Sequence, residues 1–362
     1  MTLPRVIDEN PTTIAAETIQ QYEAATGRTL YPAQIERLMI DMIAYREALI
    51  KAALNDVARQ GLVDFAREPM LSYHGARVDT YRLPPRPAQT TLRFSVAEPV
   101  SSALPIPGPP RIAATTGVLF EPQREPVIQP GQSFVDVVAL AAEPGMQHNG
   151  LLPGAITAQF DVLPDGVSVT NITPTSRGAD EEGTERFRQR IKLAQARPSA
   201  GSGKQYRYLA MTADVSVIDV SVTVIAAGHV RIALLTPLND DPLEIVAAVD
   251  AVVRRDDNRP TTDNVDVVAA TAVPVHLTYT ITPRMSALPS ALQAAAESAA
   301  LAYSIRLART LGYDVVGSEA ESLIQNLGGV KRVTVTGADV PISPMQYAVV
   351  TWTIQLTEPE HD

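Results

Sequence analysis

A proline-rich break, Leu83-Pro84-Pro85-Arg86-Pro87, divides this chain into two parts with different sequence patterns. Before the break, apolar residues recur at steps of three and four, which is the period of an amphipathic helix. After it, short segments alternate between apolar and polar residues, as strands do. Proline fixes φ and donates no backbone hydrogen bond, so a regular element is expected to end here. The 362 residues also exceed the size at which one hydrophobic core keeps growing, which predicts several subdomains.

Residues 1–85 are predicted to be helical. Asn10-Pro11 offers a capped helix start, and Pro32 opens a second helix with an unusually wide apolar face. Two interpretations of that face remain open, because it can pack on the chain's own body or in a bundle shared with other chains. As candidate inter-chain contacts we take five residues of its central line: Ile35, Met39, Met42, Arg46 and Leu49.

Residues 86–166 are predicted to form a small antiparallel β domain. Thr91–Val96 and Ser133–Leu140 alternate in the manner of half-buried strands. Pro- and Gly-rich stretches such as Leu104–Gly108 and Ile128–Gly131 separate the strands and are typical of rigid turns. We interpret these connections as ordinary loops first and as interaction loops second.

The remaining sequence predicts two mixed α/β subdomains, residues 167–272 and 273–362. Asp219–Ile225 and Val230–Leu234 read as a hairpin, and Ser318 with Glu321 as a capping box at the start of a short helix. Pro289 is expected to open a long helix that ends at Gly312. Further helices are predicted at 184–196, 205–213 and 240–253, and further strands at 265–271, 275–281, 330–336 and 347–356. The expected fold class is therefore α+β and multidomain.

Composition excludes several classes of function. The chain has no cysteine, which rules out disulfides, thiolate catalysis and zinc–sulfur sites. A net charge of −10 with only 5% aromatic residues argues against nucleic-acid binding. The N-terminus lacks an apolar signal region, and no stretch approaches the length of an uncharged membrane span. We expect synthesis in the cytosol without a signal peptide, and no direct membrane insertion.

The sequence offers no constellation for catalysis. Gly201-Ser202-Gly203-Lys204 lacks the glycine spacing of a phosphate-binding loop, and none of the five histidines is paired with another at helical spacing. No catalytic, cofactor-binding or metal-binding residue is therefore predicted, and the chain is not expected to be an enzyme. A carboxylate-based hydrolase would need a paired carboxylate site, which the sequence does not offer.

The densest acidic cluster comprises Asp180, Glu181, Glu182 and Glu185. Carboxylates this close together can hold calcium or magnesium, or serve glycoside hydrolysis. The favoured interpretation is structural, because acids at a helix start complement its dipole and the following arginines can form ion pairs. Arg186 and Arg190 lie four residues apart on one helix face, so we take both as candidate inter-chain contacts. Reversing their charges is expected to weaken assembly without unfolding the monomer.

Four segments, taken in order, resemble the baseplate J-like family, the wedge proteins of contractile phage tails and related injection particles. Gly61–Ala66 follows the N-terminal helices, and Gly145–Gly150 is similar to the family's Gly-x-x-Gly-Asn turn, with His148 in place of its second glycine. Gly178–Ile191 with Gly201–Tyr206 carries the best match. Gly328–Val333 resembles the family's Pro-Gly-Val turn, with Gly328 in place of the proline.

The resemblance implies a structural protein of a tail baseplate, in a virion or an injection particle. Its implied partners are other copies of itself, a second wedge protein, the central hub or spike, and sheath-initiating proteins. The wedges would close into a six-fold ring around the spike that rearranges on firing. The N-terminal helices would join an inter-chain bundle, the C-terminal α/β region would contact neighbouring wedges, and hinges would lie near Pro84-Pro85 and Pro260.

The alternative from another class is an extracellular receptor-binding or adhesin-like module built on the β domain. Such a module would be a self-sufficient homotrimer with an aromatic ligand surface. The low aromatic content speaks against it.

Overall fold

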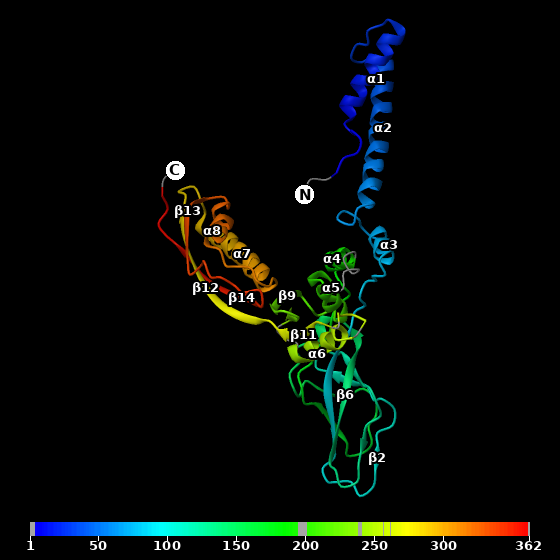
Figure 1. Ribbon diagram of the computed structural model, residues 1–362, viewed down its shortest axis with the longest axis vertical. Helices are drawn as coiled ribbons and strands as arrows, with labels where there is room; N and C mark the ends of the chain where they lie inside the picture. The colour runs from blue at the N-terminus through cyan, green and yellow to red at the C-terminus, as the bar shows by residue number, and fades with distance from the viewer. Residues whose placement is uncertain (1–3, 195–200, 238–240, 256, 261, 361–362) are drawn as a thin grey trace. The chain divides into compact units, whose positions relative to one another are not determined.

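The computed structural model describes residues 4–194, 201–237, 241–255, 257–260 and 262–360 (Figure 1). The fold is α+β, as predicted. The chain forms two compact units: unit 1 comprises Met1–Arg82 with Thr184–Ala194, and unit 2 comprises Leu83–Gly183 with Gln195–Asp362. The boundary after Arg82 coincides with the proline-rich break in the sequence. The finer division into four domains stays a prediction.

Unit 1 is helical, with α1 (Pro11–Thr26), α2 (Ile35–Gln60), α3 (Met70–Ala76) and α4 (Thr184–Ala194). The side chain of Asn10 accepts a hydrogen bond from Thr12 N, which confirms the predicted cap of α1. Ile14 of α1 packs with the small residues Ala44 and Ala48 of α2. Because α1 covers this small-residue face, the large apolar side chains of α2 are left uncovered.

A buried amide holds the N-terminal arm of unit 1 on α2. Asn55 is fully buried and accepts hydrogen bonds from the backbone of Val6 at 3.0 Å and of Ile7 at 3.1 Å. Its amide group donates to Ile7 O at 2.9 Å and to Glu9 at 2.8 Å. All four hydrogen-bonding positions of this side chain are thus used, as burial of an amide requires.

A separate small core joins α3 and α4. Phe187 and Ile191 of α4 pack with Ala66 and Leu71, and all four side chains are buried. A Cβ atom at Gly75 would lie 2.7 Å from the ring of Phe187, so this glycine permits a close helix approach. In sequence, α4 lies between the two segments of unit 2, yet its apolar face belongs to unit 1.

Unit 2 begins with an antiparallel six-stranded sheet of order β7-β3-β4-β6-β1-β8. The β domain that the alternation predicted is confirmed, with Leu92, Phe94, Ile112 and Phe120 fully buried between its strands. A two-residue pairing of β2 (Leu104–Pro105) with β5 (Val127–Ile128) lies outside this sheet. The six strands are β1 (Pro87–Ser95), β3 (Ile112–Ala114), β4 (Leu119–Pro122), β6 (Phe134–Pro144), β7 (Ile156–Gln159) and β8 (Ser168–Asn171).

The next part of unit 2 is a three-stranded mixed sheet of order β11-β10-β9 with two helices. The predicted hairpin is confirmed, because β9 (Asp219–Ala226) and β10 (His229–Leu235) pair antiparallel. β11 (Asn264–Ala269) adds in parallel. The helices are α5 (Gly203–Ala213) and α6 (Pro242–Val253). The sequence predicts that helix α4 continues to residue 196, but residues 195–196 lie outside the described part of the chain.

The last part of unit 2 is a sheet of order β13-β12-β14, with α7 and α8 on one face (Figure 1). The elements are β12 (Thr271–Pro283), α7 (Pro289–Ala308), α8 (Gly317–Gln325), β13 (Val330–Thr336) and β14 (Gln346–Leu356). β14 runs parallel to β12 and β13 antiparallel to it. Leu277, Tyr279, Ala296 and Ile324 lie in the core between sheet and helices.

Two local predictions for this region are wrong. Ser318 and Glu321 do not form a capping box: α8 has Val316 at its cap position and no side-chain cap bond. Glu321 instead accepts a hydrogen bond from Val335 N of β13 at 3.0 Å, a tertiary partner that competes with the local one. The long helix α7 ends at Ala308, before Gly312, which has φ 65° and lies against Pro344.

Candidate functional site

Two of the segments that carry the family resemblance meet in unit 2 through Asn149 and Gly178. Asn149 Nδ2 donates to Gly178 O at 2.8 Å, and Gly178 N donates to Asn149 Oδ1 at 2.7 Å. A Cβ atom at Gly178 would lie 2.4 Å from Gly145 O and 2.7 Å from Asn149 Oδ1. Since Cβ atoms do not approach backbone oxygens so closely, only glycine fits here. We call residues 145–150 and 175–182, together with Arg86 and Asp214, the signature junction.

The 145–150 turn of the signature junction is held from several directions. Gly145 adopts φ 137°, in the region that favours glycine. Met146 N donates to Asp180 Oδ1 at 3.0 Å, which gives this acidic residue a structural role. Thr175 Oγ1 donates to His148 O at 2.7 Å. His148, which replaces a glycine of the family's turn, is buried here.

Three acidic residues of the cluster, Asp180, Glu182 and Glu185, bind separate partners. Glu182 is 2% exposed and accepts a hydrogen bond from Leu83 N at 3.1 Å. Glu185 pairs with Arg188 at 3.3 Å in the first turn of α4, as the structural interpretation expects. Within the described residues, no three His, Asp or Glu side chains are grouped so that they would hold a metal ion.

A buried ion network connects the β domain to the end of α5. Asp214, whose side chain is 1% exposed, pairs with Arg86 at 2.8 Å and with Arg177 at 3.2 Å. Arg86 also donates to Arg177 O at 2.7 Å and to Ser216 Oγ at 2.7 Å. Arg177 reaches Glu244 of α6 at 2.9 Å. Two arginines from the β-domain side therefore converge on one buried carboxylate.

Electrostatics keep this carboxylate ionised. Burial alone would raise the pKa of Asp214, but hydrogen bonds from Arg86 and Ser216 N and the positive charges of Arg86 and Arg177 outweigh it. The net effect holds the pKa of Asp214 below its usual range.

We expect the free energy of unfolding of unit 2 to fall at acid pH. A carboxyl group with a lowered folded-state pKa stabilises the fold above its unfolded-state pKa of about 4, and this stabilisation is lost as the pH falls through the folded-state value. Urea unfolding from pH 7 to pH 3 measures the decline. The pKa values of Asp136 and Asp161 are also lowered, so both carboxyl groups contribute to the decline. The Asp214→Asn variant is therefore measured for comparison. A decline equally steep in that variant would exclude Asp214 as a source.

The second glycine-rich motif, Gly201–Tyr206, caps and anchors α5. Ser202 Oγ accepts from Gln205 N at 3.2 Å, and Gln205 Oε1 accepts from Gly201 N at 2.7 Å. Tyr206 Oη donates to Asp263 at 2.6 Å, and burial together with this carboxylate raises the pKa of Tyr206 far above its usual range. The motif is a structural anchor in unit 2.

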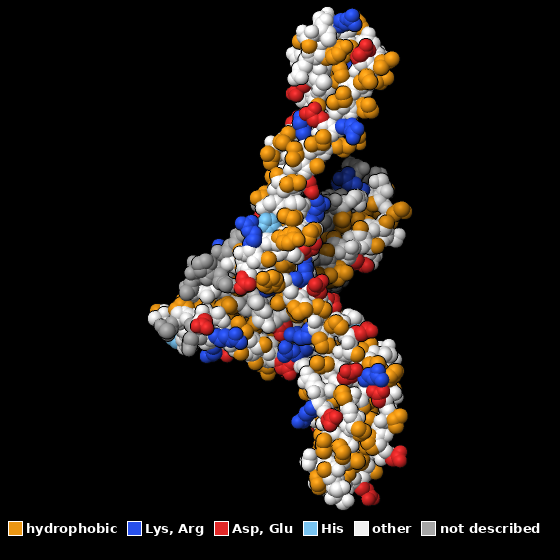
Figure 2. Space-filling view, turned by 90° about the vertical axis from the view of Figure 1, so that its right-hand side faces the viewer, with side chains coloured by type: hydrophobic (Ala, Val, Ile, Leu, Met, Phe, Trp, Pro, Cys, Tyr) orange, Lys and Arg blue, Asp and Glu red, His pale blue; other side chains and the backbone are white. Residues whose placement is uncertain are grey.

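In unit 1, the candidate contacts on α2 are all exposed. Ile35 is 72% exposed, Met39 56%, Met42 61% and Leu49 54%, and Arg46 is exposed with them. Hydrophobic side chains gather along the α1–α2 part at the top of Figure 2. We call these residues and their apolar neighbours the α2 apolar face; the neighbours are Leu38, Ile43, Ile50, Leu54 and Val57.

The two arginine candidates on α4 differ from this pattern. Arg186 is half-buried, and Arg190 is only 1% exposed and donates to Tyr81 O at 3.2 Å. The expectation that charge reversal at Arg190 leaves the monomer folded is therefore wrong, because a carboxylate there would be enclosed within unit 1. Spacing alone placed both arginines on one face without showing that the face packs inward.

Sequence reasoning missed the residues of the ion network. Arg86 was noticed only as part of the proline-rich break, and Arg177 and Asp214 carry no motif. Their partners lie far away in sequence: Arg86 and Asp214 are 128 positions apart. Arg177 has φ 65°, unusual for a residue with a side chain, and no composition signal marks it.

Comparison with known proteins finds a family match within unit 2. Residues 91–178 match the family model for the baseplate J-like protein barrel domain, a span that runs from β1 to Gly178 of the signature junction. No curated protein matches the chain. Among solved structures, the chain is similar to one in the cryo-EM structure of the anti-feeding prophage (AFP) baseplate, 6-fold symmetrised. The two are 12% identical, with 93% of this chain and 90% of that one covered, at a TM-score of 0.46. The match of residues 91–178 to the barrel-domain model confirms the resemblance to the baseplate J-like family.

Proposed function

We propose that this chain is a structural component of the baseplate of a contractile tail or injection particle. The observation that carries the proposal is the match of residues 91–178 to the baseplate J-like barrel domain. The residues that the sequence singled out around this domain form hydrogen bonds and ion pairs that hold the fold together. This is what a mechanical part needs, and we assign the chain no catalytic role.

The finer proposal is a wedge component that associates with itself and with a second wedge protein. Support comes from the α2 apolar face, since α1 packs on Ala44 and Ala48 and leaves large apolar side chains in water. Burying apolar surface yields about 25 cal/mol per Å², so a continuous face of this kind favours association. Wedges of this kind would close into a six-fold ring around a central spike, through a contact that repeats until the ring is complete.

Further partners in this proposal are the central hub or spike and the sheath-initiating proteins, with the baseplate as the final location. No helix in the described part of the chain has the length and apolar character needed to cross a membrane. The proposed rearrangement on firing needs hinges. The unit boundary between Arg82 and Leu83 falls beside Pro84-Pro85, which supports a hinge there.

Replacing Met39 and Met42 together by glutamate is expected to lower incorporation of the chain into particles by at least about tenfold. Two carboxylates would have to be buried in an apolar contact, which is strongly unfavourable. Both side chains are exposed in the chain itself, so its thermal unfolding should not change. The measurement is quantitative mass spectrometry of particles purified from cells that naturally produce the protein.

The matched control is Met285→Glu with Leu288→Glu in unit 2. Both side chains are more than half exposed, at 56% and 74%, and they lie three positions apart, as Met39 and Met42 do. The control variant should incorporate normally. Normal incorporation of the Met39/Met42 variant would contradict the proposed role of the α2 apolar face. A wild-type chain that is absent from particles and purifies as a free homotrimer would contradict the baseplate role itself.

A further inference from the structure

The strand β14 forms an unprotected edge of the last sheet in unit 2. Within the described residues, this sheet has the order β13-β12-β14, so β14 has β12 on one side only. Its eleven residues, Gln346–Leu356, contain no charged residue, no proline and no glycine. Proteins usually protect such an edge with charge or proline. β13 at the opposite edge follows that rule, because it carries Lys331 and Arg332.

The register shows which backbone groups of β14 face outward. Thr271 N donates to Met345 O, and Thr357 N donates to Ile281 O, so the odd-numbered residues of this strand direct their backbone groups towards β12. Backbone groups alternate in direction along a strand. The N–H and C=O groups that face the open edge therefore belong to Ala348, Val350, Trp352, Ile354 and Leu356.

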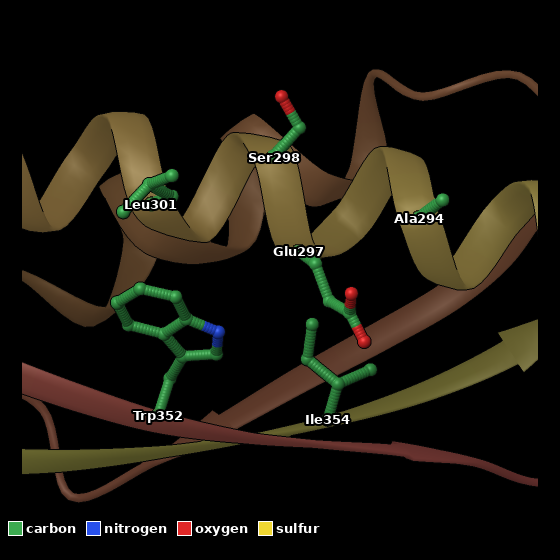
Figure 3. Close-up of a pocket in the computed structure, with 6 residues that line it drawn as sticks. All are labelled: Ala294, Glu297, Ser298, Leu301, Trp352 and Ile354. Carbon is green, nitrogen blue, oxygen red and sulfur yellow. The ribbon is translucent and has the colours of Figure 1, made fainter.

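A groove runs along this edge between β14 and α7. Its lining comes from Trp352 and Ile354 of β14 and from four residues of α7, namely Ala294, Glu297, Ser298 and Leu301. Figure 3 shows Trp352 and Ile354 pointing from the strand towards the helix, while Glu297 points from the helix towards the strand. Two of the residues whose backbone faces the open edge, Trp352 and Ile354, thus also place their side chains in the groove.

The helix α7 has a second apolar stripe that the sheet does not cover. Its inward stripe includes Leu292, Ala296 and Leu307, which are buried. Leu301 and Ile305 are each 48% exposed and lie four residues apart on another face, in line with Ala294 and Ser298 of the groove. This stripe of α7 is therefore only partly covered by the described residues.

We propose that β14 pairs antiparallel with β14 of a second copy of this chain about a two-fold axis. Pairing would join the two sheets into one of six strands and bring the two α7 helices side by side, with their Leu301–Ile305 stripes in contact. A strand without charge can pair with itself without placing like charges opposite each other. With Leu301 of one copy opposite Ile305 of the other, the two-fold axis passes near residue 303 of α7, so Glu297 of one copy lies opposite Arg309 of the other.

The two-fold arrangement also limits the assembly. One pairing uses the β14 edge of both copies, and the edges that remain are the two charged β13 strands. The contact therefore closes at two copies and does not propagate into a fibre. It would be one of the self-contacts that the baseplate role requires, and to that extent it rests on the proposed function.

Disulfide crosslinking of the full chain tests the pairing. The chain has no cysteine of its own, so introduced thiols report only on their own position. Thiols are placed on the exposed face of β14 by three substitutions: Thr351→Cys, Thr353→Cys and Gln355→Cys. These variants are crosslinked singly and in pairwise mixtures. Directly opposed residues of antiparallel strands lie within disulfide range. All cysteine variants also carry Met39→Glu and Met42→Glu, so that the α2 apolar face contributes no self-association.

The expected result is a covalent dimer for one position or mixture on β14, and none for the matched controls Thr334→Cys and Thr336→Cys on β13. Leu301→Lys with Ile305→Lys should also weaken dimerisation by at least about tenfold in sedimentation equilibrium, whereas Leu323→Lys on α8 should not. A chain that stays monomeric at about 100 µM, or that crosslinks only through β13, would overturn the proposal. So would a crosslink in producing cells that joins β14 to a different polypeptide. None of these outcomes affects the incorporation test of the α2 apolar face, so failure of the β14 pairing can be distinguished from failure of the proposed function.

Discussion

Replacing Gly178 with alanine is expected to lower the free energy of unfolding of unit 2 by about 3 kcal/mol. The new Cβ atom would meet Gly145 O at 2.4 Å and Asn149 Oδ1 at 2.7 Å. Gly145 O belongs to the backbone, so it cannot move aside as the end of a flexible side chain can. The two hydrogen bonds between Asn149 and Gly178 would be lost or lengthened as the segments separate. Urea unfolding at neutral pH, followed by circular dichroism, measures the change.

Gly183→Ala is the matched control, because a Cβ atom there would have nothing within 4 Å. It makes the same chemical change five positions along the chain, and we expect an effect within about 0.5 kcal/mol. If both variants unfold at the same urea concentration as the wild type, the close approach at Gly178 does not hold the signature junction. If both are destabilised equally, the effect comes from alanine in this segment and not from the contact with Gly145.

The periodic parts of the fold could be predicted from sequence. Alternation identified the β9–β10 hairpin and the strands of the β domain, and steps of three and four identified α2. In each case the pattern lies within a few residues of chain, where local propensity and burial act together. The width of the apolar face of α2 followed from the same count, but the count did not decide whether the chain itself covers that face.

The predictions that failed depend on partners far away in sequence. Glu321 matches a capping box locally, but the amide of Val335 reaches it first in the folded chain. Arg190 reads as a surface charge by residue type, yet it is enclosed in unit 1 with Tyr81 O as a partner. No periodicity reports such contacts, since one sequence position carries no information about which distant group will lie beside it. The same limit applies to the buried ion network.

Replacing Asp214 with asparagine is expected to lower the free energy of unfolding of unit 2 by about 3 kcal/mol at pH 7. Arg86 and Arg177 would remain directed at a position that no longer carries a charge, with Arg86 still held by Ser216 Oγ and Arg177 O. Removing one partner of a buried pair leaves desolvated charge uncompensated, which costs more than the pair contributed. Chemical unfolding of the full chain measures the difference, and the hydrogen exchange of β1 and α5 reports where it acts.

The control is Glu244→Gln, which removes the other carboxylate partner of Arg177. Glu244 is 47% exposed, against 1% for Asp214, so water can solvate the guanidinium once the pair is broken. Exposed pairs contribute little, and we expect a loss below about 1 kcal/mol. A similar loss in both variants would mean that burial of Asp214 does not set the strength of the network. A larger loss for Asp214→Asn, with faster hydrogen exchange confined to the amides of β1 and α5, would show that this carboxylate joins the β domain to the α/β part of unit 2.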